Sequence, residues 1–77
     1  MLDLKPLLPT HRYRIELIDG ARIDVDAEGM WPTATTLEWW ITVSVIGLPR
    51  LVCAQRCRSS EVVNVERDDG HHWPGPL

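Results

Sequence analysis

Residues 12–28, RYRIELIDGARIDVDAE, alternate strictly between polar and apolar side chains on both sides of Asp19-Gly20. An alternation with a period of two is typical of a half-buried strand, and a glycine-containing turn between two such runs indicates an antiparallel hairpin. The stretch contains no catalytic nucleophile, metal-ligand cluster or phosphate-binding loop. It therefore predicts architecture and does not indicate a function.

The charges of this hairpin predict its register. A three-residue turn at 18–20, with Gly20 in the left-handed conformation, sets Ile15 opposite Ile23 on an apolar face. The other face then holds three pairs of opposite charge, which are Glu16 with Arg22, Arg14 with Asp24, and Arg12 with Asp26. A two-residue turn would instead set Ile15 against Asp24 and mix the two faces. We expect the three-residue turn, with ion pairs that contribute only ~0.2–1 kcal/mol each and mainly specify register.

Length and composition limit the class of protein. A fold of 77 residues is one domain with a small core, because it buries only about 60% of the surface that its unfolded chain exposes. The formal net charge of -3 gives no general attraction to phosphate backbones, so nucleic acid is disfavoured as a partner. Seven of the eight basic residues are Arg, and this bias toward GC-rich codons indicates a high-GC bacterium or a phage of one.

Compartment is indicated by the amino terminus and the cysteines. Residues 1–9, MLDLKPLLP, carry an acid and two prolines and lack the apolar segment of a signal peptide. The longest uncharged run, residues 39–49, is far shorter than the about 20 residues of a membrane helix. Cys53 and Cys57 on one strand would lie about 13 Å apart, which is too far for a disulfide. We expect a cytoplasmic protein with free thiols and no membrane partner.

The rest of the chain predicts further β-structure. Val45 is expected opposite Val52 in a second hairpin. The predicted elements are a loop at 29–36, a strand at 37–46, a four-residue turn at 47–50, a strand at 51–58, a helical turn at 59–61 and a last strand at about 62–66.

Three segments are expected along the chain. Residues 1–11 form an N-terminal arm rich in Pro and Leu, residues 12–67 form the β domain, and residues 68–77 form a flexible tail. The arm could pack on its own domain or dock on a partner through its leucines, which are Leu2, Leu4, Leu7 and Leu8.

The strand count predicts a mainly β fold. We expect a single small five-stranded antiparallel sheet, strongly bent or closed into a partly open barrel, with hairpins at 12–28 and 37–58. Over residues 12–67 this arrangement resembles the SH3-like and Sm-like small barrels in the number and spacing of its strands and in the short turn before the last one. It is also similar to small proteins encoded by actinobacteria and their phages. Neither resemblance implies a functional residue.

Residue types that could carry catalysis or bind metal are not arranged for either. His71-His72 lies in the tail beside two aspartates, and Cys53 and Cys57 have no second close pair of ligands. Ser44 is expected inside a strand and lies in no nucleophile elbow. A sheet of this size also has little room for a substrate pocket. We therefore predict no enzyme, no metal, no cofactor and no small-molecule substrate.

The arginines in and just before the predicted strand at 51–58 suggest one binding function. Arg50, Arg56 and Arg58 could contact phosphates while Trp31 stacks on a base, as in single-stranded nucleic-acid binders. Arg56 and Arg58 are in phase with apolar Val52, so the strand must either leave the core there or contain a bulge.

The favoured function is protein binding. Four tryptophans are many for 77 residues, and they cannot all be covered by so small a sheet. Trp39 is assigned to the core. The surface assigned to a protein partner or to self-association consists of Trp40, Ile46, Met30, Trp31 and Pro32. The leading hypothesis is a non-enzymatic interaction module, and a small barrel that binds single-stranded nucleic acid is the alternative.

Overall fold

The computed structural model describes residues 5–73, and of Trp73 it describes the backbone alone. The elements are β1 (His11–Leu17), β2 (Arg22–Ala27), β3 (Gly29–Pro32), β4 (Thr36–Val45), β5 (Leu48–Arg58), the 3₁₀ helix η1 (Ser59–Glu61), β6 (Val62–Arg67) and β7 (His72–Trp73). The predicted mainly β class is confirmed. So are the helical turn at 59–61 and the strand that follows it.

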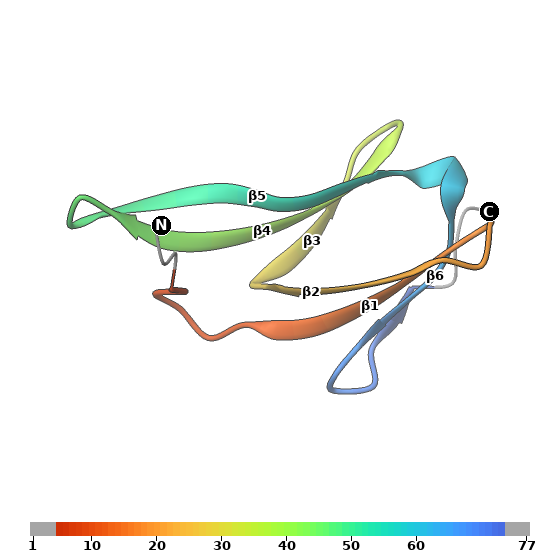
Figure 1. Ribbon diagram of the computed structural model, residues 1–77, viewed down its shortest axis with the longest axis horizontal. Coiled ribbons are helices and arrows are strands. Elements are labelled where there is room, and N and C mark those ends of the chain that lie inside the picture. The colour runs from red at the N-terminus through yellow and green to blue at the C-terminus, as the bar shows by residue number, and fades with distance from the viewer. Residues whose placement is uncertain (1–4, 74–77) are drawn as a thin grey trace.

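The strands form two antiparallel sheets instead of the single five-stranded sheet expected from the sequence. One has the order β2-β1-β6-β7 and the other the order β3-β4-β5, and together they do not close into a barrel. Figure 1 shows the long β4–β5 hairpin above β1, β2 and β6, with a sharp corner between β2 and β3 and with η1 leading from β5 to β6. The chain therefore passes twice from one sheet to the other.

The first hairpin has the register that its charges predict. Leu17 N–H donates to Ala21 C=O over 2.9 Å, and Gly20 takes a φ of 89°, as the three-residue turn requires. Ile15 faces Ile23. The three ion pairs of the exposed face are all present, between Arg12 and Asp26 at 3.1 Å, Arg14 and Asp24 at 3.5 Å, and Arg22 and Glu16 at 3.6 Å.

The corner between the sheets lies at Glu28. Its N–H donates to Trp40 C=O over 2.8 Å, and its carboxylate Oε2 accepts the N–H of Thr42. The residues that follow were expected to form a loop, but Gly29–Pro32 pairs with β4 as the strand β3. That strand is too short for its alternation to be visible in the sequence, and Pro32 stands at its end, where a missing N–H is tolerated.

The second hairpin corrects the predicted register. The turn consists of Ile46 and Gly47 alone, and Val45 faces Leu48 instead of Val52. Pro49 misled the prediction, because proline usually ends a strand. It is tolerated here because β5 is an edge strand among those described. Ala54 is an extra residue between the pairs Trp40–Cys53 and Trp39–Gln55, so the bulge that the sequence offered as one of two explanations is present.

The core lies between the two sheets. The predicted core residue Trp39 is fully buried, and its ring meets that of Tyr13 edge to face at 6.4 Å and 66°. Aromatic pairs of this geometry add about 0.5–1.5 kcal/mol beyond the burial of their area. The other buried members of this cluster are Ile15, Ala27, Leu37, Cys57, Val62 and Val65. Cys53 and Cys57 are free thiols.

Both flanking segments add to the sheets. In the arm, Pro6 bridges to Val43 and Leu7 N–H donates to Thr42 C=O over 2.9 Å, which extends the edge of β4 beyond Glu28. Leu7 and Leu8 remain half exposed, and the arm residues Leu2 and Leu4 lie outside the described residues. Residues 68–73 continue the larger sheet through β7, where the sequence predicted a flexible tail, because the turn after β6 is closed by Asp69 and Arg67.

Candidate interaction surface

The three-stranded sheet has one face toward the core and one face away from it. Alternation along β4 and pairing with β3 and β5 place an uncharged strip on the second face. We call this strip the outer face. It consists of Trp31, Trp40, Thr42, Ser44, Pro49, Leu51 and Cys53. The ion pair of Glu38 with Arg56 lies on the same side of the sheet, at one end of the strip.

A groove of about 570 Å³ lies at one end of the outer face. Its apolar wall is formed by Trp40, by Trp31, which is 67% exposed, and by Leu51, which is 61% exposed. Glu28, Gly29 and Glu38 complete the lining. We call this the tryptophan groove. Its volume is within the range of sites that take a small molecule or a few side chains.

Glu38 holds the ring of Trp40 in place. Its carboxylate is 15% exposed and accepts the indole N–H of Trp40 over 3.2 Å and the guanidinium N–H of Arg56 over 2.8 Å. Because the indole N–H of Trp40 already has an acceptor, the ring can contact a partner without leaving a buried donor unpaired. Glu28 uses Oε2 for Thr42, and within residues 5–73 no cation is paired with it. Of the two groove carboxylates, Glu38 therefore has a cationic partner, and none is found for Glu28 among the described residues.

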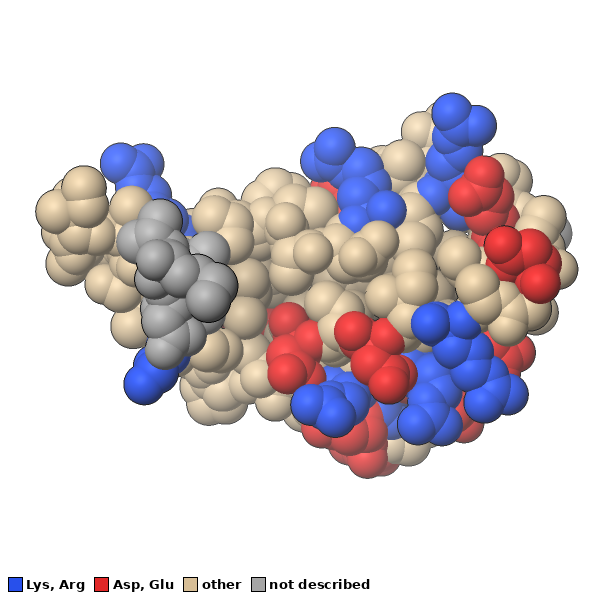
Figure 2. Space-filling model, viewed as in Figure 1, with Lys and Arg blue, Asp and Glu red and all other residues tan. Residues whose placement is uncertain are grey.

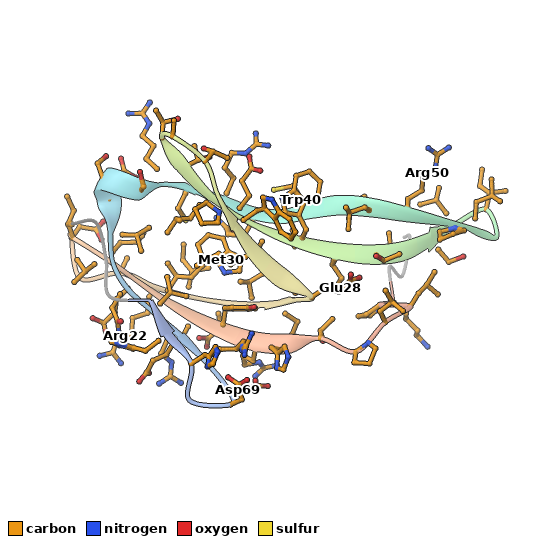
Figure 3. The ribbon with its side chains drawn as sticks, turned by 180° about the vertical axis from the view of Figure 1, so that it is seen from behind. Arg22, Glu28, Met30, Trp40, Arg50 and Asp69 are labelled. Atoms are coloured by element: carbon orange, nitrogen blue, oxygen red, sulfur yellow. The ribbon has the colours of Figure 1, made fainter. Side chains whose placement is uncertain are left out.

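The structure brings together some of the residues that the sequence assigned to protein binding and separates others. Trp31 and Trp40 share the groove, whereas Met30 packs against the core between the sheets (Figure 3). Pro32 is exposed at the end of β3. Ile46 is 97% exposed at the tip of the β4–β5 hairpin, six residues beyond Trp40 and thus roughly 20 Å from it.

The sequence prediction missed four lining residues, which are Gly29 and the three with side chains, Leu51, Glu28 and Glu38. Leu51 was given the wrong register against β4, because the turn before it was predicted to be four residues long. Glu28 is the last residue of the segment predicted as the first hairpin, and the break after Ala27 that turns it toward β4 leaves no local signal. Glu38 could have been found, since it precedes two tryptophans and alternates with Trp40 on one face.

The three arginines proposed for nucleic acid do not form one basic patch. Arg56 is paired with Glu38. Arg50 faces Val43 and Arg58 faces Thr36, at opposite ends of β5, which sets them roughly 26 Å apart. Trp31 lies across the sheet on β3. The arrangement lacks the continuous cationic track that follows a single strand.

Several ionisable groups of the larger sheet pair with one another. Asp68 accepts a hydrogen bond from the backbone N–H of Arg12 and forms another with the ring Nδ1 of His11. These contacts lower the pKa of Asp68. The hydrogen bond from Arg67 lowers the pKa of Asp69 in the same way. Hollows of about 340 and 240 Å³ lie beside these pairs. Most of these charges have a partner on a neighbouring strand or in the adjacent turn, which is typical of a structural role.

Comparison of the chain with protein-family models, with curated proteins and with solved structures found no match. Among the described residues, no three His, Cys, Asp or Glu side chains are grouped so that they could hold a metal ion. The same part of the chain contains no helix long and apolar enough to cross a membrane.

Proposed function

We propose that this chain is a non-enzymatic protein-interaction module that binds through the outer face of its three-stranded sheet. The observation that carries the proposal is the tryptophan groove, in which Trp31 and Leu51 stay exposed beside a Trp40 ring fixed by Glu38. Tryptophan is enriched among the residues that dominate binding energy, and the central parts of interfaces are depleted in charge. The outer face has both properties.

The cost of leaving this face in water supports the same proposal. A tryptophan can bury 150–250 Å² on contact, at about 25 cal/mol per Å². Trp31 contributes little to the core of its own chain, since its neighbour Met30 is the side chain that packs there. Its main contribution is therefore expected in a complex. Free thiols at Cys53 and Cys57 support the further proposal that the complex forms in a reducing cytoplasm.

The test is an affinity capture from a lysate of the native host with the wild-type chain and two variants. Trp31→Ala removes the exposed wall of the groove, and Ile18→Ala removes a side chain of the same 67% exposure at the turn between β1 and β2. Proteins that bind through the groove should be retained by wild type and Ile18→Ala and reduced at least about ten-fold by Trp31→Ala. Equal capture by all three chains would refute the assignment of this surface.

A further inference from the structure

Ile46 has a backbone conformation that isoleucine avoids. Ile46 and Gly47 form the two-residue turn between β4 and β5, with φ values of 50° and 75°. Positive φ at both positions defines a type I′ turn, for which Asn-Gly is the preferred sequence. A β-branched residue in the left-handed region is strained, and among residues 5–73 Ile46 is the only non-glycine with positive φ.

Ile46 is also 97% exposed, so no contact within its own chain offsets this strain. The hairpin that carries it projects beyond the other sheet (Figure 1). Figure 2 shows that most charged side chains, and all the acidic ones in view, lie toward the opposite end of the molecule, and Figure 3 shows Arg50 beside the projecting tip. A strained and exposed apolar residue at this tip is unfavourable in the monomer. It is explained if the tip contacts a partner.

The same sheet supplies a complementary site. Ile46 directly follows β4, and the alternation of Trp40, Thr42 and Ser44, if extended by one step, assigns it to the same side of the hairpin. The tip and the tryptophan groove then lie toward the two ends of the outer face. The strip between them bears no charged side chain. A two-fold axis that runs between two such faces, level with Val43 of each β4, would therefore place the tip of each copy over the groove of the other, with the two uncharged faces in contact.

Pairing through the open edge of β5 is the other way in which two copies could meet. The charged residues of β5 are Arg50, Arg56 and Arg58 and include no acid. Antiparallel pairing of two such strands about Cys53 would set Arg50 opposite Arg56 of the other copy, and like charges directly opposite destabilise a sheet. Charge therefore opposes the edge contact and leaves the face contact unopposed.

We propose that the chain forms a two-fold symmetric dimer in which the Ile46 tip of each copy docks in the tryptophan groove of the other. This inference rests on the proposed function and specifies a second copy of the chain as the partner. The packing is sheet on sheet, at the usual separation of about 10 Å.

The test separates folding from association through the variant Ile46→Asn. Asparagine relieves the strained turn, so the monomer should unfold at a higher temperature than wild type when both are diluted below the dimer dissociation constant. The same change should weaken the dimer at least about ten-fold, measured by sedimentation velocity over a range of concentrations. Ile18→Asn, at the turn between β1 and β2, is the matched control and should change neither dimerisation nor the strain at residue 46.

A mixing experiment checks the docking geometry. In the Trp31→Ala chain the groove is damaged and the tip is intact, and in the Ile46→Asn chain the reverse holds. A mixture of the two should associate more tightly than either variant alone, because the mixed dimer keeps one of its two contacts. A mixture no tighter than the separate variants would overturn the proposed docking.

The failures of the two proposals can be told apart. A wild-type chain that stays monomeric at high micromolar concentration, or an Ile46→Asn dimer as tight as wild type, overturns the dimer. If that monomeric chain still captures a host protein in a manner dependent on Trp31, the interaction function stands and its partner is a different protein. If neither association is found, both proposals are refuted.

Discussion

At the scale of single residues, Trp39 fills the centre of the core but buries an indole N–H that has no acceptor among the described residues. Its ring is fully buried against Tyr13, and its indole Nε1 has no hydrogen-bond partner among the described residues. A buried donor without a partner costs about 1–3 kcal/mol. Trp39 therefore stabilises the fold through its volume and reduces that stability through its N–H.

Two substitutions at this position should differ sharply. Trp39→Phe keeps an aromatic ring and removes the unpaired N–H, so it should lower the free energy of unfolding by less than about 1.5 kcal/mol. Trp39→Ala should cost about 3–5 kcal/mol, enough to abolish cooperative unfolding in a domain of this size. Urea denaturation followed by circular dichroism measures both. Losses of similar size would show that the N–H is not a significant cost.

At the scale of elements, Glu28 makes hydrogen bonds to the edge of β4 that a neighbouring strand would otherwise make. Its backbone N–H and carboxylate bind the edge of β4 between β3, which begins at Gly29, and the arm, which reaches β4 at Pro6 and Leu7. Glu28→Ala leaves the partly buried N–H of Thr42 unpaired and should destabilise the protein by about 1–3 kcal/mol. Glu28→Gln keeps a carbonyl acceptor and should lose much less in the same thermal or urea measurement. A glutamine variant as unstable as the alanine variant would argue against this role.

The hairpin of β6 and β7 should respond to acid through Asp68. The Arg12 N–H, and after it His11, hold the pKa of Asp68 below its ordinary value, so the folded state binds a proton less readily than the unfolded state. The contribution of Asp68 is fully present above the unfolded pKa of about 3.9, and it is lost as the pH falls through the lower folded pKa.

Asp68→Asn tests this linkage. The variant should have a lower thermal midpoint than wild type at neutral pH, and the difference should shrink as the pH falls below about 4. Glu66→Gln is the control, since no hydrogen bond to the Glu66 side chain is found within residues 5–73. A wild-type advantage that persists unchanged in acid would contradict the role of Asp68.

At the scale of the whole molecule, the cross-strand charge pairs and the uncharged outer face lie on different sheets, although β5 of the smaller sheet also carries three arginines. The larger sheet carries the arginines and carboxylates that pair with one another, and the smaller sheet carries the uncharged outer face (Figure 2). The paired charges keep one side of the molecule in water without offering an uncompensated site. The association that we propose uses the side that the β4–β5 hairpin forms.

The sequence predicted contacts between residues that are close along the chain better than contacts between residues that are far apart along it. The first hairpin could be predicted in register because its turn, its alternation and its charge pairs all lie within residues 12–28. The second hairpin was shifted, because Pro49 and the extra residue Ala54 hide the pairing from a local pattern. Of the interaction surface, the exposed tryptophans were predicted and their common groove was not.

The sequence by itself determined the β class, the first hairpin, the short helical turn before β6 and the core role of Trp39, since each depends on neighbours along the chain or on one large apolar side chain. Only the tertiary structure decided that Glu28 turns β2 into a second sheet, that Trp31 and Leu51 join Trp40, and that Ile46 occupies a strained tip. Those outcomes depend on hydrogen bonds between distant strands, and a local pattern of side chains does not encode which strands will meet.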